Sequence, residues 1–384
     1  DPPRSAVFLS AGPRPCLSEE IPFMKYFKRR HMEMAGLYFM FHADPKIGTG
    51  HLFRCCKIAD FIREKYGIEF SFNFTEKPLP AARRLLEGRR VWSMGTHVEK
   101  LPCFGDRPAL VVLDDYSIGF EEERLIREGV YRLAVIDDLV RRHTCDVLFD
   151  GNILRRPEEY SESAATVGKM CCGPEYSLVG RDFISARRAR TPPFRKCLVS
   201  FGGSDPQHCL RTFVRTAMSD PRFRKYRFEI VSGPMNGDHS AVLRMLLESD
   251  LDWNIRKSTE FMPELMKESD FALGAGGGMF LERVAACLPS VTVSEADNQS
   301  CNIMAAREKG LSLVLDESSL SDADALLAAF DGLEANAPLY EKNSRELIDG
   351  RGIERVAKAL IECAEETLDL VYPQSGGTSP GTPA

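Results

Sequence analysis

One histidine of this chain lies in a setting that suits acid–base chemistry. His51 closes the turn Ile47-Gly48-Thr49-Gly50, between an apolar run at 37–41 and a helix-like stretch at 52–65. This order of strand, glycine turn and helix directs the imidazole toward the carboxyl edge of a parallel sheet. The positive end of the helix dipole disfavours an imidazolium there, so a neutral ring can accept a proton. We therefore predict that His51 is a general base or orients a water molecule.

A second glycine-rich segment occurs in the other half of the chain. Gly274-Ala275-Gly276-Gly277-Gly278 follows an apolar strand candidate and leads into a helix that carries Glu282. Glycines leave backbone N–H groups accessible and the helix dipole favours an anion, so this loop suits a diphosphate. The turn Gly202-Gly203-Ser204 also follows a strand and lets the backbone approach a ligand, although glycine there equally serves a tight turn. A base and an anion site in opposite halves indicate catalysis on a nucleotide-linked substrate held between two domains.

The elements that must position these groups alternate between short β-rich runs and amphipathic stretches. This alternation predicts an α/β fold with two Rossmann-like open-sheet domains that face a cleft. The first half has predicted strands at 37–41, 68–73, 109–113, 132–136 and 147–150, and predicted helices at 52–65 and 120–128. The second half has predicted strands at 196–201, 227–231, 253–256, 271–273, 290–293 and 312–315, and predicted helices at 208–218, 239–248, 263–268, 301–309 and 355–365.

The domain boundaries follow from changes in composition. A segment rich in arginine and proline at 184–194 breaks the alternation and is the predicted linker. We assign 35–185 to an N-terminal domain that carries the candidate base His51, and 195–365 to a C-terminal domain that carries the predicted diphosphate loop. Residues 1–34 mix prolines with a basic patch and are interpreted as a disordered or non-native extension. Residues 366–384 are interpreted as a disordered tail.

Composition excludes several classes of function. The chain of 384 residues has a net charge of −6, which gives no general attraction to nucleic acid. Its 12 cysteines include no C-x-x-C pair and no histidine at zinc-finger spacing, so we expect reduced thiols, a cytoplasmic protein and no metal site. The apolar runs fall far short of the roughly 20 residues that span a bilayer, and we expect no membrane partner. We also expect a monomer.

Five separated segments match one family in order. They are Ile47-Gly48-Thr49-Gly50-His51 with Arg54; Asp114-Asp115-Tyr116; 135–139 leading to His143-x-Cys145-Asp146; 199–206; and 274–277 through Glu282-Arg283 to Asn298-Gln299. In these segments the chain resembles the UDP-2,4-diacetamido-2,4,6-trideoxy-β-L-altropyranose hydrolases of pseudaminic acid biosynthesis, and the resemblance covers about residues 37–362. It implies the glycosyltransferase B fold, as in the lipid II N-acetylglucosaminyltransferase. It also implies cleavage of UDP from a UDP-linked acetamido sugar by water, with inversion and without a metal or cofactor.

The resemblance also implies roles for individual residues. The implied catalytic residues are His51, Tyr116 and Asn298, with Tyr116 lining the sugar site. The predicted substrate-binding residues are Gly48, Gly50, Arg54, Gly202, Gly203, Ser204, Gly276, Gly277, Gly278, Glu282 and Gln299. In this fold a carboxylate placed like Glu282 accepts hydrogen bonds from the ribose diol. The amides of Asn298 and Gln299 can recognise acetamido groups as both donors and acceptors.

The residue types alone leave an alternative open at each of these positions. His51 could cap its helix, Tyr116 could be an exposed loop residue, Glu282 could be a solvated helix residue, and Asn298 could be a helix cap. The same patterns would also fit a transferase of this fold, which needs a second substrate, or a noncatalytic protein that binds sugar nucleotides.

Three further acidic residues and a histidine follow predicted strands or lie near them. Asp137 and Asp138 could touch the sugar or cap the next turn, and we favour capping for at least one. His143 and Asp146 could form a local hydrogen-bonded pair.

Overall fold

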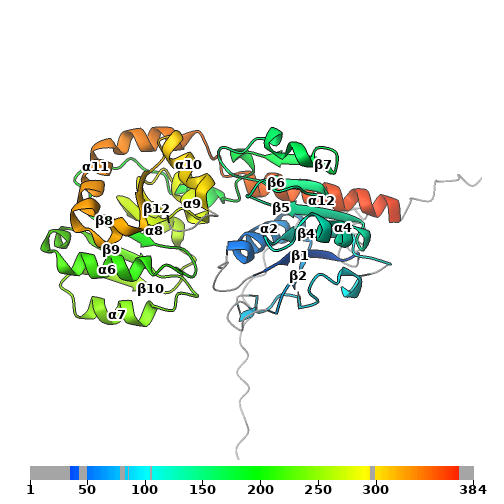
Figure 1. Cartoon of the computed structure of the whole chain (residues 1–384), viewed down its shortest axis with the longest axis horizontal. Coiled ribbons are helices and arrows are strands. Elements are labelled where there is room, and N and C mark those ends of the chain that lie inside the picture. Colours follow the sequence, from blue (N-terminus) through cyan, green and yellow to red (C-terminus); the bar gives the residue numbers. More distant parts are fainter. Residues whose placement is uncertain are drawn as a thin grey trace, which may run out of the picture.

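The computed structural model describes residues 35–42, 50–77, 83–84, 86–103, 106–294 and 299–371. Its core consists of two parallel sheets, each in its own lobe (Figure 1). The strands read as continuous apolar runs because helices cover both faces of each sheet, which buries both sets of side chains. The fold is therefore α/β with two Rossmann-like domains, as the alternating pattern predicts.

The first sheet has seven strands in the order β3-β2-β1-β4-β5-β6-β7. Its strands are β1 (Leu37–Phe41), β2 (Ser71–Phe74), β3 (Val91–Trp92), β4 (Leu110–Asp114), β5 (Arg132–Ile136), β6 (Cys145–Asp150) and β7 (Val167–Cys172). The helices along this part of the chain are α2 (Gly50–Tyr66), α4 (Phe120–Glu128) and α5 (Arg181–Ser185).

The second sheet has six strands in the order β10-β9-β8-β11-β12-β13. Its strands are β8 (Lys196–Ser200), β9 (Arg227–Val231), β10 (Asp252–Arg256), β11 (Phe271–Ala275), β12 (Ser290–Ser294) and β13 (Leu313–Asp316). The helices are α6 (Cys209–Ser219), α7 (His239–Leu247), α8 (Met262–Glu268), α9 (Gly278–Ala285), α10 (Ser300–Glu308) and α11 (Ala323–Arg345).

Each sheet has one place where the chain reverses its direction of travel across the strands. In the first sheet this place lies between β1 and β4, where Phe41 pairs with Asp114. In the second it lies between β8 and β11, where Ser200 pairs with Gly274. In each sheet the connections leave the two strands at this place toward opposite sides, so a crevice opens at the carboxyl ends of the strands. Open α/β sheets bind ligands in this crevice. The fold therefore brings the loops after β1, β4, β8 and β11 to the two ligand-binding positions.

The last helix returns to the first lobe. Helix α12 (Gly352–Val371) packs its buried residues Val356, Leu360 and Ala364 into the core of β1, β2 and α2, and Figure 1 shows it along the first sheet. The sequence pattern predicts this helix up to residue 365 and assigns it to the second domain, with 366–384 as a disordered tail. Residues 366–371 instead continue the helix, in which Thr367 is fully buried and donates to the carbonyl of Cys363. The packing of Val356, Leu360 and Ala364 in the first core stabilises the helix that residues 366–371 continue.

Among the strands and α-helices given above, β3, β7, α5 and α11 were not predicted. Strands β3 and β7 lie at the edges of the first sheet, where β7 includes Gly168 and exposes Lys169, so neither gives an apolar run. Helix α11 contains Gly332 and Pro338, two residues that usually interrupt helices, yet it buries Phe330 and Leu333 in the second core. Among the described residues, no helix combines the length and apolar composition needed to cross a bilayer.

Candidate functional site

His51 meets a buried carboxylate at the reversal point of the first sheet. It is the second residue of α2, which follows β1, and its Nδ1 lies 2.6 Å from Oδ1 of Asp114, the last residue of β4. Both side chains are buried, with 4% and 0% of their surfaces exposed. The contact joins residues 63 positions apart, and the neighbouring register of β1 and β4 makes it possible. The described contacts therefore place the ring against a second strand and do not show it capping α2.

Asp114 is held as a carboxylate. Arg54 donates to both of its oxygens, and the Cys55 thiol lies 3.6 Å from Oδ2. Burial alone would raise the pKa of Asp114, but the Arg54 guanidinium and the hydrogen bond from His51 hold it well below its usual range. Arg54 Nη2 also lies 3.0 Å from His51 Nδ1. The ionised Asp114 is nevertheless the group that accepts the Nδ1 proton, because Arg54 is only a donor and two donors cannot form a hydrogen bond with each other. This tautomer leaves Nε2 as the proton acceptor.

Arg54 was predicted to bind substrate. In the structure its guanidinium is engaged by Asp114 and, at 3.0 Å, by Asp138 Oδ2. The side chain thus connects the carboxyl ends of β4 and β5 beside His51. Its role as a substrate contact stays a prediction, whereas its contacts support the function of holding Asp114 in place.

Tyr116 stands beside His51. The two rings are 4.4 Å apart at an interplanar angle of 78°, an edge-to-face arrangement. Burial, together with the neighbouring Asp138 carboxylate, raises the pKa of the Tyr116 hydroxyl well above its usual value, so it is a neutral donor. Arg141 donates to the Tyr116 carbonyl at 2.7 Å, and Asp115 accepts from the Ser117 backbone at 2.8 Å, so the loop is fixed on both sides.

A buried ion cluster lies next to this loop. His143 Nδ1 is 2.6 Å from Glu123 and Nε2 is 3.2 Å from Asp137, while Asp146 pairs with Arg127 at 3.2 Å. The predicted pair of His143 and Asp146 is therefore wrong, because alternation along β6 turns Asp146 toward a different partner. Burial alone would lower the pKa of His143, but the carboxylates of Asp137 and Glu123 raise it to about 9. His143 is thus charged at neutral pH.

Asp137 fixes the turn after β5. It accepts from the Leu139 backbone at 3.1 Å and from Arg141 at 2.8 Å, which agrees with the capping role favoured for one of the two neighbouring aspartates. Asp138 points the other way, toward Arg54. Its second oxygen, Oδ1, is buried and accepts no hydrogen bond from the described residues.

The glycine loop of the second domain is shorter than predicted. Gly274 and Ala275 belong to β11, and a Cβ at Gly274 would lie 2.2 Å from the Ser200 carbonyl, so this glycine permits close strand packing. Gly276 donates its N–H to Gln299 at 2.9 Å. Gly274 therefore serves strand packing, and the role of Gly276 as a substrate contact stays a prediction, since its N–H is used by Gln299 in this structure. Space is present at Gly278, where an added Cβ meets nothing within 4 Å.

The first turn of α9 is the part of this loop that can receive an anion. Gly277 precedes the helix, Gly278 begins it, and no side chain caps it. The first N–H groups of a helix have no acceptor within the helix, and the dipole adds positive potential there. Gln299, predicted as a substrate contact, accepts a hydrogen bond from the Gly276 N–H and so fixes the loop. Arg283 also fixes it by donating to the Ala275 carbonyl at 2.9 Å.

The turn after β8 combines an open glycine with a helix cap. Gly202 has a φ of +82° and nothing within 4 Å of an added Cβ, whereas the Gly203 carbonyl accepts from Met235 at 2.9 Å. Asp205 accepts from the backbone of Cys209 and Leu210 at the start of α6. Burial raises the pKa of Asp205 to about 6 against these hydrogen bonds. Both expected uses of the turn, ligand approach at Gly202 and tight folding after it, remain compatible with this geometry.

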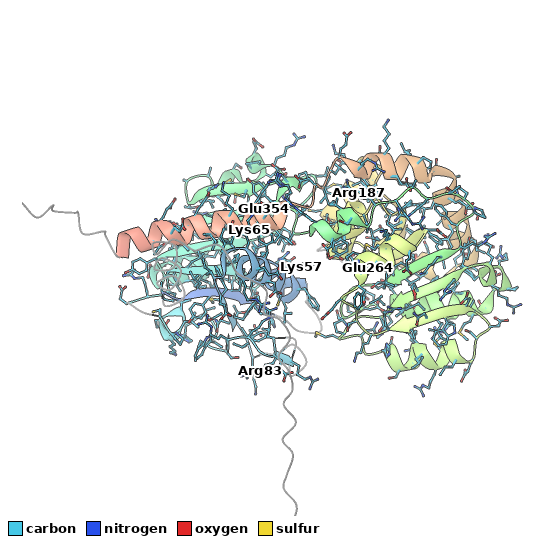
Figure 2. The ribbon with its side chains drawn as sticks, turned by 180° about the vertical axis from the view of Figure 1, so that it is seen from behind. Lys57, Lys65, Arg83, Arg187, Glu264 and Glu354 are labelled. Atoms are coloured by element: carbon cyan, nitrogen blue, oxygen red, sulfur yellow. The ribbon has the colours of Figure 1, made fainter. Side chains whose placement is uncertain are left out.

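Contacts between the lobes join segments that follow the carboxyl ends of strands. Lys57 on α2 lies 2.5 Å from Glu282 on α9, and Figure 2 shows Lys57 on the side of the first lobe that faces the second. Arg155 lies 3.1 Å from the Cys301 thiol of α10. The Lys57 and Glu282 side chains are 36% and 13% exposed, and such ion pairs contribute about 0–1 kcal/mol. The carboxyl-end edges of the two sheets therefore face each other, and these contacts between them are weak.

Two predicted residues, Gly48 and Asn298, lie outside the described residues. Gly50 begins α2, with nothing within 4 Å of an added Cβ, so backbone approach is open there as well. Asp114 was named in a matched segment of the sequence but was given no role, and Lys57 was not named. The signal for Asp114 was present, since an acidic residue directly after the apolar run 110–113 lies at the carboxyl edge of the sheet.

Comparisons with known proteins agree with this architecture. No family model matches the chain. It is 27% identical over 201 residues to the spore coat polysaccharide biosynthesis protein SpsG of Bacillus subtilis, a match that includes 51% of this chain and 59% of that protein. It is 25% identical over 97 residues to the UDP-2,4-diacetamido-2,4,6-trideoxy-β-L-altropyranose hydrolase of Campylobacter jejuni, which includes 25% of this chain and 35% of that enzyme. The chain thus spans less than two thirds of either relative.

Solved structures share the fold across most of the chain. MurG of Acinetobacter baumannii superposes with a TM-score of 0.54 at 12% identity, over 85% of this chain and 99% of that one. The UDP-GlcNAc 2-epimerase of Neisseria meningitidis, solved with UDP-GlcNAc, gives a TM-score of 0.55 at 12% identity, over 85% and 100%. The chain therefore has the glycosyltransferase B fold.

Proposed function

We propose that this protein hydrolyses a UDP-linked acetamido sugar, such as UDP-2,4-diacetamido-2,4,6-trideoxy-β-L-altrose in pseudaminic acid biosynthesis. The observation that carries the proposal is the pairing of His51 with the buried, ionised Asp114 at the reversal point of the first sheet. The resemblance in the motif segments and the similarity to the Campylobacter enzyme support the choice of substrate class.

The proposed reaction is a single displacement. A water molecule attacks the anomeric carbon while His51 Nε2 takes its proton, and the bond from that carbon to the diphosphate oxygen breaks with its electrons going to UDP. The N–H groups at the start of α9 stabilise the charge of the departing diphosphate. Attack from the face opposite UDP inverts the anomeric centre. In this proposal Tyr116, a neutral donor whose ring contacts that of His51, orients the water or the sugar.

Two other functions of the same fold are distinguished by what releases UDP. A transferase needs an acceptor other than water, whereas a binding protein releases no UDP under any condition. The histidine and its carboxylate favour a catalytic protein, because a binding protein has no use for an oriented proton acceptor.

The test is UDP release from a panel of UDP-linked acetamido sugars in water with EDTA present. We expect wild type to release UDP and His51→Ala to bind UDP normally but turn over at least about a hundredfold more slowly. The control is His97→Ala, since His97 also pairs with a glutamate, at 3.1 Å, but its side chain is 61% exposed and it lies outside the motif segments. The anomer first released, followed by NMR, reports inversion.

Other outcomes decide against the proposal. If wild type binds UDP but releases it only after an acceptor is added, the protein is a transferase. If no sugar nucleotide is consumed with any acceptor, and His51→Ala binds as wild type does, the protein is a binding protein.

A further inference from the structure

Lys57 links three elements around the region between the lobes. It lies on α2 roughly two turns after His51. Its ammonium group is 2.5 Å from Glu282 Oε1 on α9 and 5.6 Å from the centroid of the Phe183 ring on α5. Helix α5 belongs to the segment that leads from the first domain to the second. One cation from the catalytic helix of the first domain therefore touches the nucleotide helix of the second.

The position of Glu282 places this cation near the proposed diphosphate site. Glu282 is four residues after Gly278, so its Cα lies roughly 6 Å along the axis from the start of α9. Side chains of a helix tilt toward its N-terminus, which brings the Glu282 carboxylate back over the first turn. The ammonium group of Lys57 is held by that carboxylate and lies on the same side of the helix.

We infer that Lys57 is a binding residue for the diphosphate of the substrate, and that it exchanges Glu282 for the diphosphate when UDP enters. This inference rests on the proposed function, in which UDP binds at α9 and Glu282 accepts from the ribose diol. The ribose hydroxyls replace the hydrogen bond that Glu282 loses. The diphosphate offers Lys57 more negative charge than one carboxylate does.

The properties of the pair suit such an exchange. Both side chains reach solvent, so neither group is buried unpaired when the contact breaks. The lysine stem is flexible and its ammonium carries three donors, so it can follow the ligand. Because Lys57 belongs to the helix that begins beside His51, its contact with the diphosphate also draws the base toward the anomeric carbon.

The experiment compares the affinities of UDP and uridine, measured by calorimetry or NMR, in wild type, Lys57→Met, Lys57→Arg and Lys65→Met. Lys65 is a matched control, since it lies on the same helix and its ammonium is 2.9 Å from Glu354 of α12, away from the second domain (Figure 2). We expect Lys57→Met to weaken UDP binding about tenfold and to leave uridine binding unchanged or tighter, because Glu282 is then free. Lys57→Arg keeps the charge and should retain most of the UDP affinity.

A different result overturns the inference. If Lys57→Met binds UDP as tightly as wild type or more tightly, Lys57 is a tether between the lobes and no ligand of the diphosphate. Equal losses for uridine and UDP would show that the variant disturbs the site in general. If wild type itself binds neither ligand, the proposed function fails and the inference falls with it. The wild-type result therefore tests the function, and the variant result tests the role of Lys57.

Discussion

Replacing Asp114 with asparagine should lower kcat for UDP release by about 10³–10⁴ while UDP affinity stays within about twofold. The asparagine amide would face both Arg54 and His51. In wild type Arg54 Nε donates to Oδ2, whereas Arg54 Nη2 and His51 Nδ1 both contact Oδ1. An amide whose carbonyl takes the Oδ2 position turns its NH₂ group toward His51 Nδ1, which forces the proton onto Nε2. The imidazole then has the wrong tautomer and cannot accept a proton from water. Single-turnover kinetics with a saturating UDP-sugar measure the chemical step directly.

The matched control for this variant is Asp146→Asn. Asp146 also belongs to a strand of the first sheet and also pairs with an arginine, Arg127 at 3.2 Å, but it does not contact His51. We expect its turnover to remain within about threefold of wild type. A rate for Asp114→Asn within tenfold of wild type, in a protein that is folded by circular dichroism, would show that Asp114 does not set the tautomer of His51.

His143→Gln should destabilise the protein by about 3–5 kcal/mol at pH 6. The variant leaves Glu123, whose side chain is fully buried, without its cation. The loss should depend on pH, since the pKa of His143 is raised to about 9 in the folded protein from its usual value of 6.5. The stabilisation by the charged ring is complete below pH 6.5 and is lost as pH rises through 9. The gap between wild type and variant should therefore narrow by on the order of 3 kcal/mol between pH 6 and pH 10.

Denaturant titrations at pH 6, 7.5, 9 and 10 measure this gap. His97→Gln is the control, because its ion pair with Glu99 is exposed on both sides and should contribute less than about 1 kcal/mol. Parallel stability curves for wild type and His143→Gln across this range would mean that His143 is not charged in the folded protein.

The sequence predicted most elements whose apolar pattern is continuous. Strands β1, β5 and β9 and helix α4 have the predicted bounds, because each combines buried residues with clear flanking turns. Helix α11 was missed because Gly332 and Pro338 argue against a helix locally, whereas packing against the second core stabilises it. The placement of α12 also could not follow from periodicity, since an amphipathic helix does not specify which core it joins.

At the candidate site, the sequence located groups but not their partners. His51 and Tyr116 were singled out, and the structure brings their rings together. Asp114 and Arg54 meet because β1 and β4 are neighbours in the sheet, and Lys57 meets Glu282 because the second domain faces the first. A local sequence pattern indicates neither the order of the strands nor the arrangement of the domains. For the Gly274–Gly278 loop, too much was assigned from the sequence. A run of glycines was given one purpose, whereas Gly274 serves strand packing and Gly278 leaves open space.

The return of α12 to the first lobe affects how the protein is synthesised. Residues 352–371 leave the ribosome after the whole second domain, and they contribute Val356, Leu360 and Ala364 to the first core. Translation therefore delivers a complete second domain while the first still exposes the apolar surface of α2 and β1 that this helix covers. A nascent chain stalled before residue 352 should be bound by chaperones at its earlier half, and the order of domain completion is the reverse of the order of synthesis.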